Sequence, residues 1–343
     1  METLPIIGVT VGDPAGIGPE IVLAAAAEEH VANQCRPLLI GSIDNLRRTC
    51  EAVGIRARLV DVDSDGFVDG ALAVKNVPGV SPDLPFGTAT AEGGRASYDY
   101  IVEGVRMAQR AEISSLVTAP INKVALKLAG LGHQGHTELL AELTSSPWSL
   151  TYFTVRDLRV LFLTRHLSLS KAIASISQDM IVRTLERFVS VSHMVGLKSP
   201  RIALQAMNPH GGEGGLFGSE EIEILAPAVE EARSLGIDVS GPIPADSVFA
   251  LAAQGLYDVV LSLYHDIAAG VCKTVDFHGT VSTTLGLPFL RFSVDHGTAF
   301  DIAGKGIADH RNMTHTILRA ATFGRSGPSE YSRSHSTDRS KHS

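Results

Sequence analysis

The sequence predicts an α/β protein built on largely parallel sheets, and two observations carry this prediction. Short apolar runs alternate along the chain with longer stretches that have helical periodicity. Several apolar runs are hydrophobic at consecutive positions, which is typical of strands that helices cover on both faces. The expected strands are Ile6–Val11, Pro37–Ile40, Ser115–Thr118, Arg159–Thr164, Arg201–Ala206 and Val259–Leu263.

The expected helices are bounded by capping and breaking residues. Ser177 is placed to cap one helix, Gly196 follows the end of that helix, and Pro227 is expected to kink another. The expected helices are Pro19–Glu29, Ala96–Arg110, His136–Leu143, Gln178–Val195 and Ser219–Ser234.

Composition excludes several classes of protein. The 343 residues suit one large or two moderate domains, and 44% of them are hydrophobic, enough for a sizeable core. A net charge of -8 and 6% aromatic residues disfavour a nucleic-acid partner. The chain shows neither a basic leader nor an apolar run near the roughly 18 residues of a membrane helix. We therefore expect a cytoplasmic protein without nucleic-acid or membrane partners.

Cysteine usage and the last residues add two expectations. The three cysteines form no CxxC motif, which disfavours a disulfide scaffold or a zinc ribbon. Residues 324–343 are rich in serine and poor in apolar side chains, so we expect a disordered tail there.

Two glycine-rich segments are candidates for binding loops. GDPAGIGPE (Gly12–Glu20) joins an expected strand to an expected helix, and it suits either an anion near a helix N-terminus or a simple tight turn. GLGHQG (Gly130–Gly135) matches GxGxxG, but a dinucleotide fingerprint should follow a strand, and Asn122–Ala129 has the pattern of a helix. The second segment is better interpreted as a loop that presents His136 and Thr137.

Three histidines occur in matching contexts. His166, His210 and His265 each follow an expected buried strand, and open α/β sheets build their sites at the carboxyl ends of strands. Three imidazoles at such a place would suit a divalent cation, although single histidines are more often structural. Lys273 and Arg291 suit the phosphate or carboxylate of a small substrate, and the apolar surroundings of Arg291 imply an anionic partner.

Taken in order, these motifs resemble the 4-hydroxythreonine-4-phosphate dehydrogenase family of pyridoxal phosphate biosynthesis. The resemblance covers approximately residues 5–320. It rests on GDPAGIGPE, TAPINK (Thr118–Lys123), GHTELLAELT (Gly135–Thr144), NPHGGEGGLFG (Asn208–Gly218), YHD (Tyr264–Asp266) and SVDHGTAFDIAGKGIAD (Ser293–Asp309).

The resemblance implies a homodimer of two-domain subunits with the isocitrate/isopropylmalate dehydrogenase type of fold and an active site in the interdomain cleft at the dimer interface. We expect the first α/β domain in residues 1–135 and 296–323, and the second, with the metal and dimer contacts, in residues 136–295. The implied site consists of metal ligands His166, His210 and His265, and of substrate-binding residues His136, Thr137, Lys273, Ser282 and Arg291.

The implied reaction is the NAD- or NADP-dependent oxidation of the 3-hydroxyl of a 4-phosphorylated C4 hydroxy acid, with decarboxylation. It would use one divalent cation, which could be zinc, magnesium, cobalt or manganese. Ser282 stands where the family has Asn, and Ile267 and Ala268 replace the last two residues of its HDQG motif. A related branch acts on 4-phospho-D-threonate or 4-phospho-D-erythronate, and KTVDFHGTV (Lys273–Val281) resembles that branch. We expect 4-hydroxythreonine 4-phosphate as substrate, with the branch as the alternative.

The cofactor is expected on the segment His296–Asp309, which resembles the loop that holds adenosine in isocitrate and isopropylmalate dehydrogenases. The expected contacts are His296, Gly297, Thr298 and Asp309. Asp309 replaces Asn and would repel a 2′-phosphate, which favours NAD over NADP. The alternative is that this glycine-rich segment only turns the chain.

Two carboxylates and two rival functions complete the expectations. Asp266 would support the neighbouring His265 or cap a turn, and Asp246 would assist the metal or, as we slightly favour, cap a helix. The rivals are a phosphate acyltransferase, which needs neither metal nor nicotinamide, and a catalytically silent binding protein.

Overall fold

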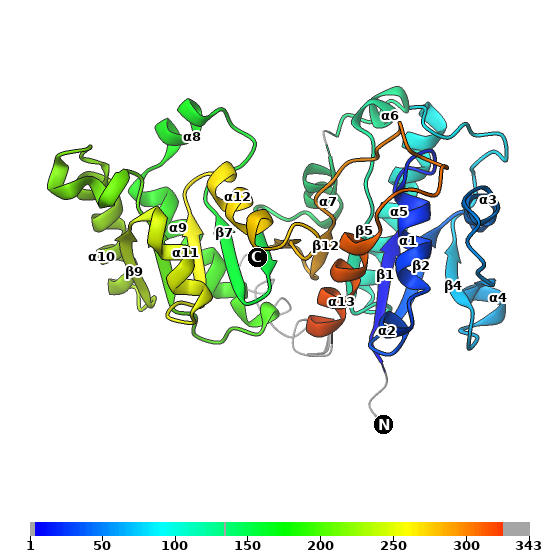
Figure 1. Ribbon diagram of the computed structural model, residues 1–343, viewed down its shortest axis with the longest axis horizontal. Coiled ribbons are helices and arrows are strands. Elements are labelled where there is room, and N and C mark those ends of the chain that lie inside the picture. Colours follow the sequence, from blue (N-terminus) through cyan, green and yellow to red (C-terminus); the bar gives the residue numbers. More distant parts are fainter. Residues whose placement is uncertain (1–3, 134, 325–343) are drawn as a thin grey trace, which may run out of the picture. The chain divides into compact units, whose positions relative to one another are not determined.

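The computed structural model describes residues 4–133 and 135–324, and the chain forms two compact units (Figure 1). Unit 1 consists of Met1–Ser149 and Leu287–Ser343, and unit 2 of Leu150–Gly286. The unit boundaries therefore differ from the expected 135/136 and 295/296. The reason is that helix α7 (His136–Thr144) packs against helix α5 (Ala91–Gln109), and strand β12 (Arg291–Ser293) pairs with strand β5 (Ser115–Thr118). Both additions belong to unit 1.

Unit 1 contains a parallel sheet with the strand order β3-β4-β2-β1-β5-β12. Helices α1, α3 and α13 pack together as one layer, and α5 packs with α6 and α7 as another. The strands not yet delimited are β1 (Ile6–Thr10), β2 (Arg36–Gly41), β3 (Leu59–Asp61) and β4 (Leu72–Asn76). The remaining helices are α1 (Gly18–Ala26), α2 (Glu29–Ala32), α3 (Ile43–Val53), α4 (Val62–Asp65), α6 (Lys123–Leu128) and α13 (Arg311–Gly324).

Unit 2 contains a mixed sheet with the strand order β11-β6-β7-β10-β8-β9. Strands β7, β10, β8 and β9 run parallel, whereas β6 is antiparallel to both of its neighbours. The strands are β6 (Leu150–Val155), β7 (Leu158–Phe162), β8 (Ile202–Gln205), β9 (Val239–Ile243), β10 (Val259–Ser262) and β11 (Val281–Leu285). The α-helices are α8 (Leu169–Ser175), α9 (Gln178–Val191), α10 (Ala226–Ser234), α11 (Ala245–Ala253) and α12 (His265–Val275).

The ends of two helices show how local sequence signals act. Ser177 caps α9 by accepting a hydrogen bond from the Met180 N–H at 3.2 Å, and the following 3₁₀ turn, Ser192–Val195, ends at Gly196 with φ of 75°. The helix expected over Ser219–Ser234 is instead a π-helical turn, Glu221–Leu225, followed by α10. Because Pro227 has no N–H to donate, the expected kink takes the form of this wider turn before it.

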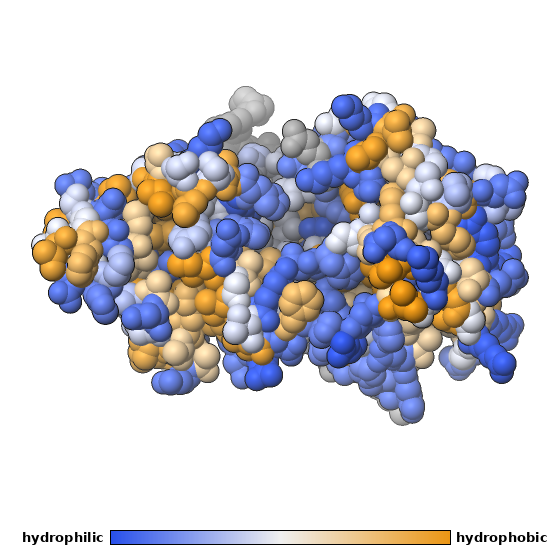
Figure 2. Space-filling view, turned by 45° about the horizontal axis from the view of Figure 1, so that its top comes forward, coloured by the Kyte–Doolittle hydropathy of each residue, from blue (hydrophilic) through white to orange (hydrophobic). Residues whose placement is uncertain are grey.

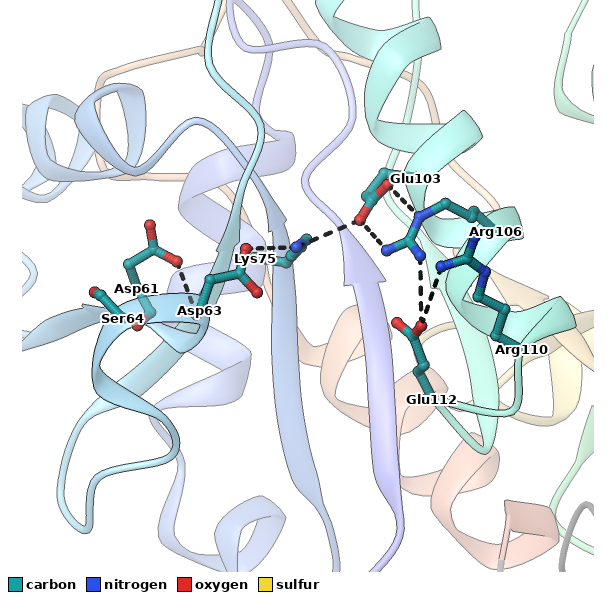
Figure 3. A network of polar contacts seen from close by, with 8 residues as sticks. All are labelled: Asp61, Asp63, Ser64, Lys75, Glu103, Arg106, Arg110 and Glu112. Carbon is teal, nitrogen blue, oxygen red and sulfur yellow. Dashed lines mark hydrogen bonds and ion pairs between the residues drawn. The ribbon is translucent and has the colours of Figure 1, made fainter.

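The surface of unit 1 carries a network of charged side chains that joins α4, β4 and α5 (Figure 3). Glu103 accepts from Arg106 Nη2 at 2.6 Å, and Lys75 Nζ lies 3.7 Å from the same carboxylate. Glu112 lies within 4 Å of both Arg106 and Arg110. Solvent-screened pairs of this kind contribute little each, so we interpret the network as a surface feature of the fold.

Two further expectations concern membrane-spanning helices and the C-terminal tail. No helix within residues 4–133 and 135–324 is long and apolar enough to cross a membrane. The tail expected over 324–343 lies outside the described residues, except that Gly324 is the last residue of α13.

Candidate functional site

The three histidines lie beyond the carboxyl ends of three neighbouring parallel strands in unit 2. Strand β10 pairs with β7 on one side and with β8 on the other. His166 follows β7, His210 follows β8, and His265 is the first residue of α12, directly after β10. The edge of the sheet thus places all three in the region where α/β enzymes bind ligands.

Two of the three imidazoles face one cavity. The ring centroids of His166 and His265 are 5.8 Å apart, and both residues line a cavity together with Tyr264 and Asp266. His265 Nδ1 is hydrogen-bonded to Asp266 Oδ1 at 2.9 Å, so Asp266 orients this ring. The donor chemistry of the pair fits a divalent cation that accepts imidazole nitrogen.

The third histidine lies in a separate turn. His210 belongs to the 3₁₀ segment Pro209–Gly215, is exposed, and has its ring centroid 6.4 Å from that of Phe217. Within the described part of the chain, no three His, Cys, Asp or Glu side chains come together as a metal-binding group. The structure therefore brings together His166 and His265, and leaves His210 apart from them.

Asp246 does not cap helix α11, so the interpretation that we favoured for it is wrong. The N-cap position is taken by Pro244, no side chain caps this end, and Asp246 is the exposed second residue of the helix. Helix α11 contacts the His210 segment, and Pro244 Cγ would lie 3.8 Å from a Cβ on Gly211. Asp246 therefore lies in the helical turn next to that segment.

Unit 1 contains a second cavity, and its central cation is Arg291. Arg291 is 5% exposed, and its Nε and Nη2 atoms donate to Thr118 Oγ1 at 3.0 and 2.6 Å. Burial lowers the pKa of the guanidinium to about 9, so it is still charged at neutral pH. The cavity is lined by Thr118, Pro120, Ile121, His136, Arg291, Ser293, Val294, His296 and Gly297.

His136 faces the same cavity as a neutral ring. Its Nε2 atom is buried and has no hydrogen-bond partner among the described residues. Burial, and secondarily the charge of Arg291, hold the pKa of His136 well below 6.5. His136 and Thr137 form the first turn of α7, where backbone N–H groups and the helix dipole favour an anion. The arrangement fits a phosphate or carboxylate beside Arg291.

Helix α6 precedes the GLGHQG segment, and α7 follows it. The dinucleotide fingerprint needs a strand before its first glycine, so this match has no such role. Gly135 is the N-cap residue of α7, so this segment directly precedes His136 and Thr137.

The remaining substrate candidates, Lys273 and Ser282, lie in unit 2. Lys273 is in the last turn of α12, with its Nζ 5.5 Å from the centroid of the Phe277 ring. Ser282 is half-buried in β11. The expected substrate residues are therefore divided, with His136, Thr137 and Arg291 in unit 1.

The segment expected to hold the cofactor packs against GDPAGIGPE in unit 1. The Ile17 N–H donates to Thr298 O at 3.0 Å, and the Gly306 N–H donates to Glu20 Oε2 at 3.2 Å. A Cβ on Gly16 would lie 3.0 Å from Thr298 O, so this close approach requires glycine. His296 and Gly297 are exposed at the cavity of Arg291, where a flat ring and bare backbone fit the adenosine part of a nicotinamide cofactor.

Asp309 has a partner that the sequence argument did not include. Its carboxylate accepts from Arg311 Nε at 3.0 Å and from the Arg311 backbone N–H at 3.0 Å. The Arg311 guanidinium offsets the negative charge of Asp309. Asp309 is therefore no longer a reason to favour NAD over NADP.

Sequence reasoning missed three residues that hold these loops. Thr118 receives two hydrogen bonds from Arg291, and Glu20 holds Gly306. Asp13 accepts from the Ala15 N–H at 2.9 Å, and burial raises the pKa of Asp13 to about 6. All three belong to quoted motifs, TAPINK and GDPAGIGPE, which were the available signal.

The fold and the two cavities define a class of two-unit α/β enzymes that act on small anionic molecules, and comparisons with known proteins identify the family. Residues 33–320 match the family model of pyridoxal phosphate biosynthetic protein PdxA. A Symbiobacterium thermophilum protein, provisionally described as D-threonate 4-phosphate dehydrogenase, is 44% identical over 327 residues, which are 94% of this chain and 98% of that protein.

Two solved structures agree. A 4-hydroxythreonine-4-phosphate dehydrogenase from Klebsiella pneumoniae has a TM-score of 0.88 at 37% identity, over 94% of this chain and 99% of that one. Another from Burkholderia phymatum has a TM-score of 0.85 at 40% identity, with the same coverage. The chain belongs to the PdxA family. It is a dehydrogenase that acts on a CH–OH group, which confirms the expected class of reaction.

Proposed function

We propose that this dehydrogenase oxidises the 3-hydroxyl of a 4-phosphorylated C4 hydroxy acid, with loss of carbon dioxide, using NAD or NADP and a divalent cation. The observation that carries the proposal is the unit 1 cavity, where the buried guanidinium of Arg291 and the neutral ring of His136 lie side by side. A buried guanidinium of this kind is best matched by an anionic oxygen of the substrate.

His166 and His265, whose rings line one cavity, would hold the cation. The sequence proposes His210 as a third ligand, whereas the structure leaves it apart from the other two among the described residues. Their imidazoles favour zinc or cobalt over magnesium, which prefers oxygen ligands. The bound cation would supply Lewis acidity at the 3-hydroxyl, and the nicotinamide would accept the hydride. Asp266 keeps the ring of His265 in one orientation through the bond between its Oδ1 and His265 Nδ1.

The substrate's anionic groups would be held by residues from both sets. Arg291, His136 and Thr137 form one group in unit 1, and Lys273 and Ser282 form the other in unit 2. Their contribution is orientation, because holding the phosphate and carboxylate places the C3 hydrogen for transfer.

A second candidate substrate, D-threonate 4-phosphate, is favoured by a specific observation. The relative that is 44% identical carries that provisional description, whereas the solved structures named for 4-hydroxythreonine 4-phosphate are 37% and 40% identical. Ser282, at the position where the resemblance gives Asn, would lie on the substrate side of the proposed site. The two molecules differ at C2, which bears a hydroxyl in one and an amino group in the other.

Parallel measurements of kcat/KM on the two phosphorylated acids, with NAD and with NADP, test the proposal. A hundredfold preference for D-threonate 4-phosphate, about 2.7 kcal/mol of transition-state discrimination, would assign the chain to that branch. Turnover of neither acid with either cofactor would refute the proposed reaction.

We also propose a cytoplasmic homodimer. Unit 2 exposes apolar side chains on its surface (Figure 2), including Leu169 at 54%, Leu216 at 72% and Ile222 at 55%. Where such side chains form a contiguous patch, the patch marks an interaction surface. Light scattering after gel filtration should give twice the monomer mass, and a monomer at micromolar concentration would contradict the proposal.

Replacing His296 with Ala should raise the KM for the nicotinamide cofactor several-fold and leave the metal content unchanged. The exposed ring lies beside the cavity of Arg291, where it would contact the cofactor. The matched control is Gly132→Val in the GLGHQG loop, because a Cβ there meets no atom of residues 4–133 and 135–324 within 4 Å. If the Gly132 variant raises the KM and the His296 variant does not, the cofactor assignment is wrong.

A further inference from the structure

The loop that follows β1 buries a carboxyl group that the proposed reaction does not use. Asp13 is 1% exposed, and its Oδ1 atom accepts from the Ala15 N–H at 2.9 Å. Its Oδ2 atom has no hydrogen-bond partner within residues 4–133 and 135–324, and no cation of these residues pairs with it. Because a buried charge without partners costs more free energy than a buried neutral acid, burial raises the pKa of Asp13 to about 6.

Helix α5 packs on this acid but supplies it with no hydrogen bond among the described residues. A Cβ on Gly93, in the first turn of α5, would lie 2.9 Å from Asp13 Oδ1. The Gly93 N–H already donates to Thr90 Oγ1 at 3.0 Å. The acid is therefore enclosed by the helix without being neutralised by it.

The titratable groups around Asp13 in the described part of the chain carry no positive charge. Tyr100 of α5 is close enough for the charge of Asp13 to act on it, and burial raises the pKa of its phenol, which stays neutral. Glu92 of α5 accepts from the Ser81 N–H. Glu20 of α1 is buried, and burial raises its pKa as well. Loss of a proton by Asp13 thus adds an uncompensated negative charge to this loop.

The same loop holds two segments that wall the unit 1 cavity. The Asp13 N–H donates to Pro120 O at 2.9 Å, and Pro120 lines the cavity. The Ile17 N–H donates to Thr298 O at 3.0 Å, and the preceding residue, Gly297, lines the cavity as well. A displacement of the loop at Asp13 therefore reaches both walls, and all of these segments belong to unit 1.

We propose that Asp13 is a proton-linked positioning residue of the unit 1 cavity. As a neutral acid it lets the loop close on Pro120 and Thr298, whereas loss of its proton draws the carboxylate toward water and loosens both contacts. The cavity then binds an anion more weakly, because the backbone around Arg291 is no longer held in place. This inference rests on the proposed function, in which Arg291 holds an anionic group of the substrate. Asp13 has no contact with that anion and acts only through the backbone.

The test is the affinity for sulfate, measured by titration calorimetry on the purified full-length chain. Sulfate keeps its charge over the range used, and Arg291 stays protonated below its pKa of about 9. Every protein carries His296→Ala, because His296 lines the cavity and an exposed imidazole changes charge near neutral pH. The Kd for sulfate should rise at least about fivefold between about pH 5 and about pH 7.5, a coupling of the size usual between two sites.

Asp13→Asn removes the titration and keeps an oxygen for the Ala15 N–H. Because its amide is neutral, like the protonated acid, sulfate should bind as tightly at about pH 7.5 as at about pH 5. Asp44→Asn is the matched control, since Asp44 is an exposed acid of α3 in the same unit, and this variant should keep the pH dependence. The same weakening in the Asp13 variant would assign the titration to another group, such as His136 or Glu20, and overturn the inference.

Arg291→Met separates this inference from the function on which it rests. Sulfate binding should be lost at both pH values, because the guanidinium of the cavity is absent. Equal affinity of the Met variant would show that sulfate does not bind beside Arg291, and the proposed anion site itself would fail. Binding that needs Arg291 but does not change with pH in the protein that keeps Asp13 would overturn only the role of Asp13.

Proton uptake provides a second measurement, which does not depend on the folding of a variant at Asp13. Coupling between two sites is reciprocal, so sulfate should favour the protonated acid and its binding at about pH 6 should take up a fraction of a proton. Calorimetry in two buffers of different ionisation enthalpy measures this uptake. Sulfate binding without proton uptake would contradict the proposal.

Thermal melting of Asp13→Asn tests the cost of the buried charge directly. The folded chain keeps a proton on Asp13 that the unfolded chain has lost, so stability falls as the pH rises to about 6. The variant should therefore melt at a higher temperature than the unchanged protein, with a larger gain at about pH 7.5 than at about pH 5. A lower melting temperature at both pH values would show that the ionised group stabilises the loop, against the proposal.

Discussion

Replacing His210 with Ala should abolish metal retention and reduce dehydrogenase activity by about 10³-fold or more, because Lewis-acid stabilisation at a hydroxyl is worth several kcal/mol. The side chain is exposed and lies outside the core of unit 2, so the variant should remain folded. Metal analysis of the purified protein measures metal retention, and an assay of nicotinamide reduction measures activity. Thermal melting shows whether the variant is folded.

His193→Ala is the matched control for this experiment. His193 is also an exposed histidine of unit 2, but it lies in the 3₁₀ turn after α9, away from the strand ends. It should retain metal and activity. Full activity of the His210 variant in the presence of a chelator would show that the reaction needs no cation at this site.

Replacing Arg291 with Met should lower kcat/KM by about 10²- to 10³-fold, because losing one partner of a buried, charge-assisted pair costs about 2–5 kcal/mol. The loss should not come from unfolding. Burial opposes the charge of Arg291, whereas the change also removes two hydrogen bonds to Thr118, so the two effects should offset each other and the melting temperature should change little. A variant with unchanged kcat/KM would remove Arg291 from the substrate site.

The pH dependence provides a second measurement on the same residue. In the protein without substrate, burial lowers the pKa of the Arg291 guanidinium to about 9, and only the protonated form attracts an anion, so kcat/KM should fall as the pH rises through about 9. The fall should be absent in the Met variant, which has no titrating group at this position. A fall at the same pH in both proteins would assign the titration to another group.

Local sequence signals were sufficient for the elements that are regular and strongly patterned. The apolar run Ser115–Thr118 is strand β5 with the expected bounds, and the helix expected from His136 begins at His136. Six strands were not predicted: β3, β4, β6, β9, β11 and β12. Of these, β3 and β12 have only three residues each, so neither shows a periodicity, and both are strands because a neighbouring strand pairs with them.

The candidate site divides in the same way. The strand pattern was enough to place His166, His210 and His265 at the carboxyl ends of strands, because that position follows from chain order alone. It did not predict that the ring centroids of His166 and His265 lie 5.8 Å apart while His210 lies beside Phe217. Those contacts depend on the loops after the strands, whose backbone carries no repeating signal.

By itself, the sequence determined the α/β class, the order of the motifs and membership of the PdxA family, since these depend on residue types and their spacing. Only the tertiary structure decided the charge and the orientation of the side chains in the candidate site. Arg291 meets Thr118, 173 positions away in the sequence, and Glu221 turns inward beneath the His210 segment. Burial and hydrogen bonds between distant segments set charge and orientation, and both arise only when those segments are brought together.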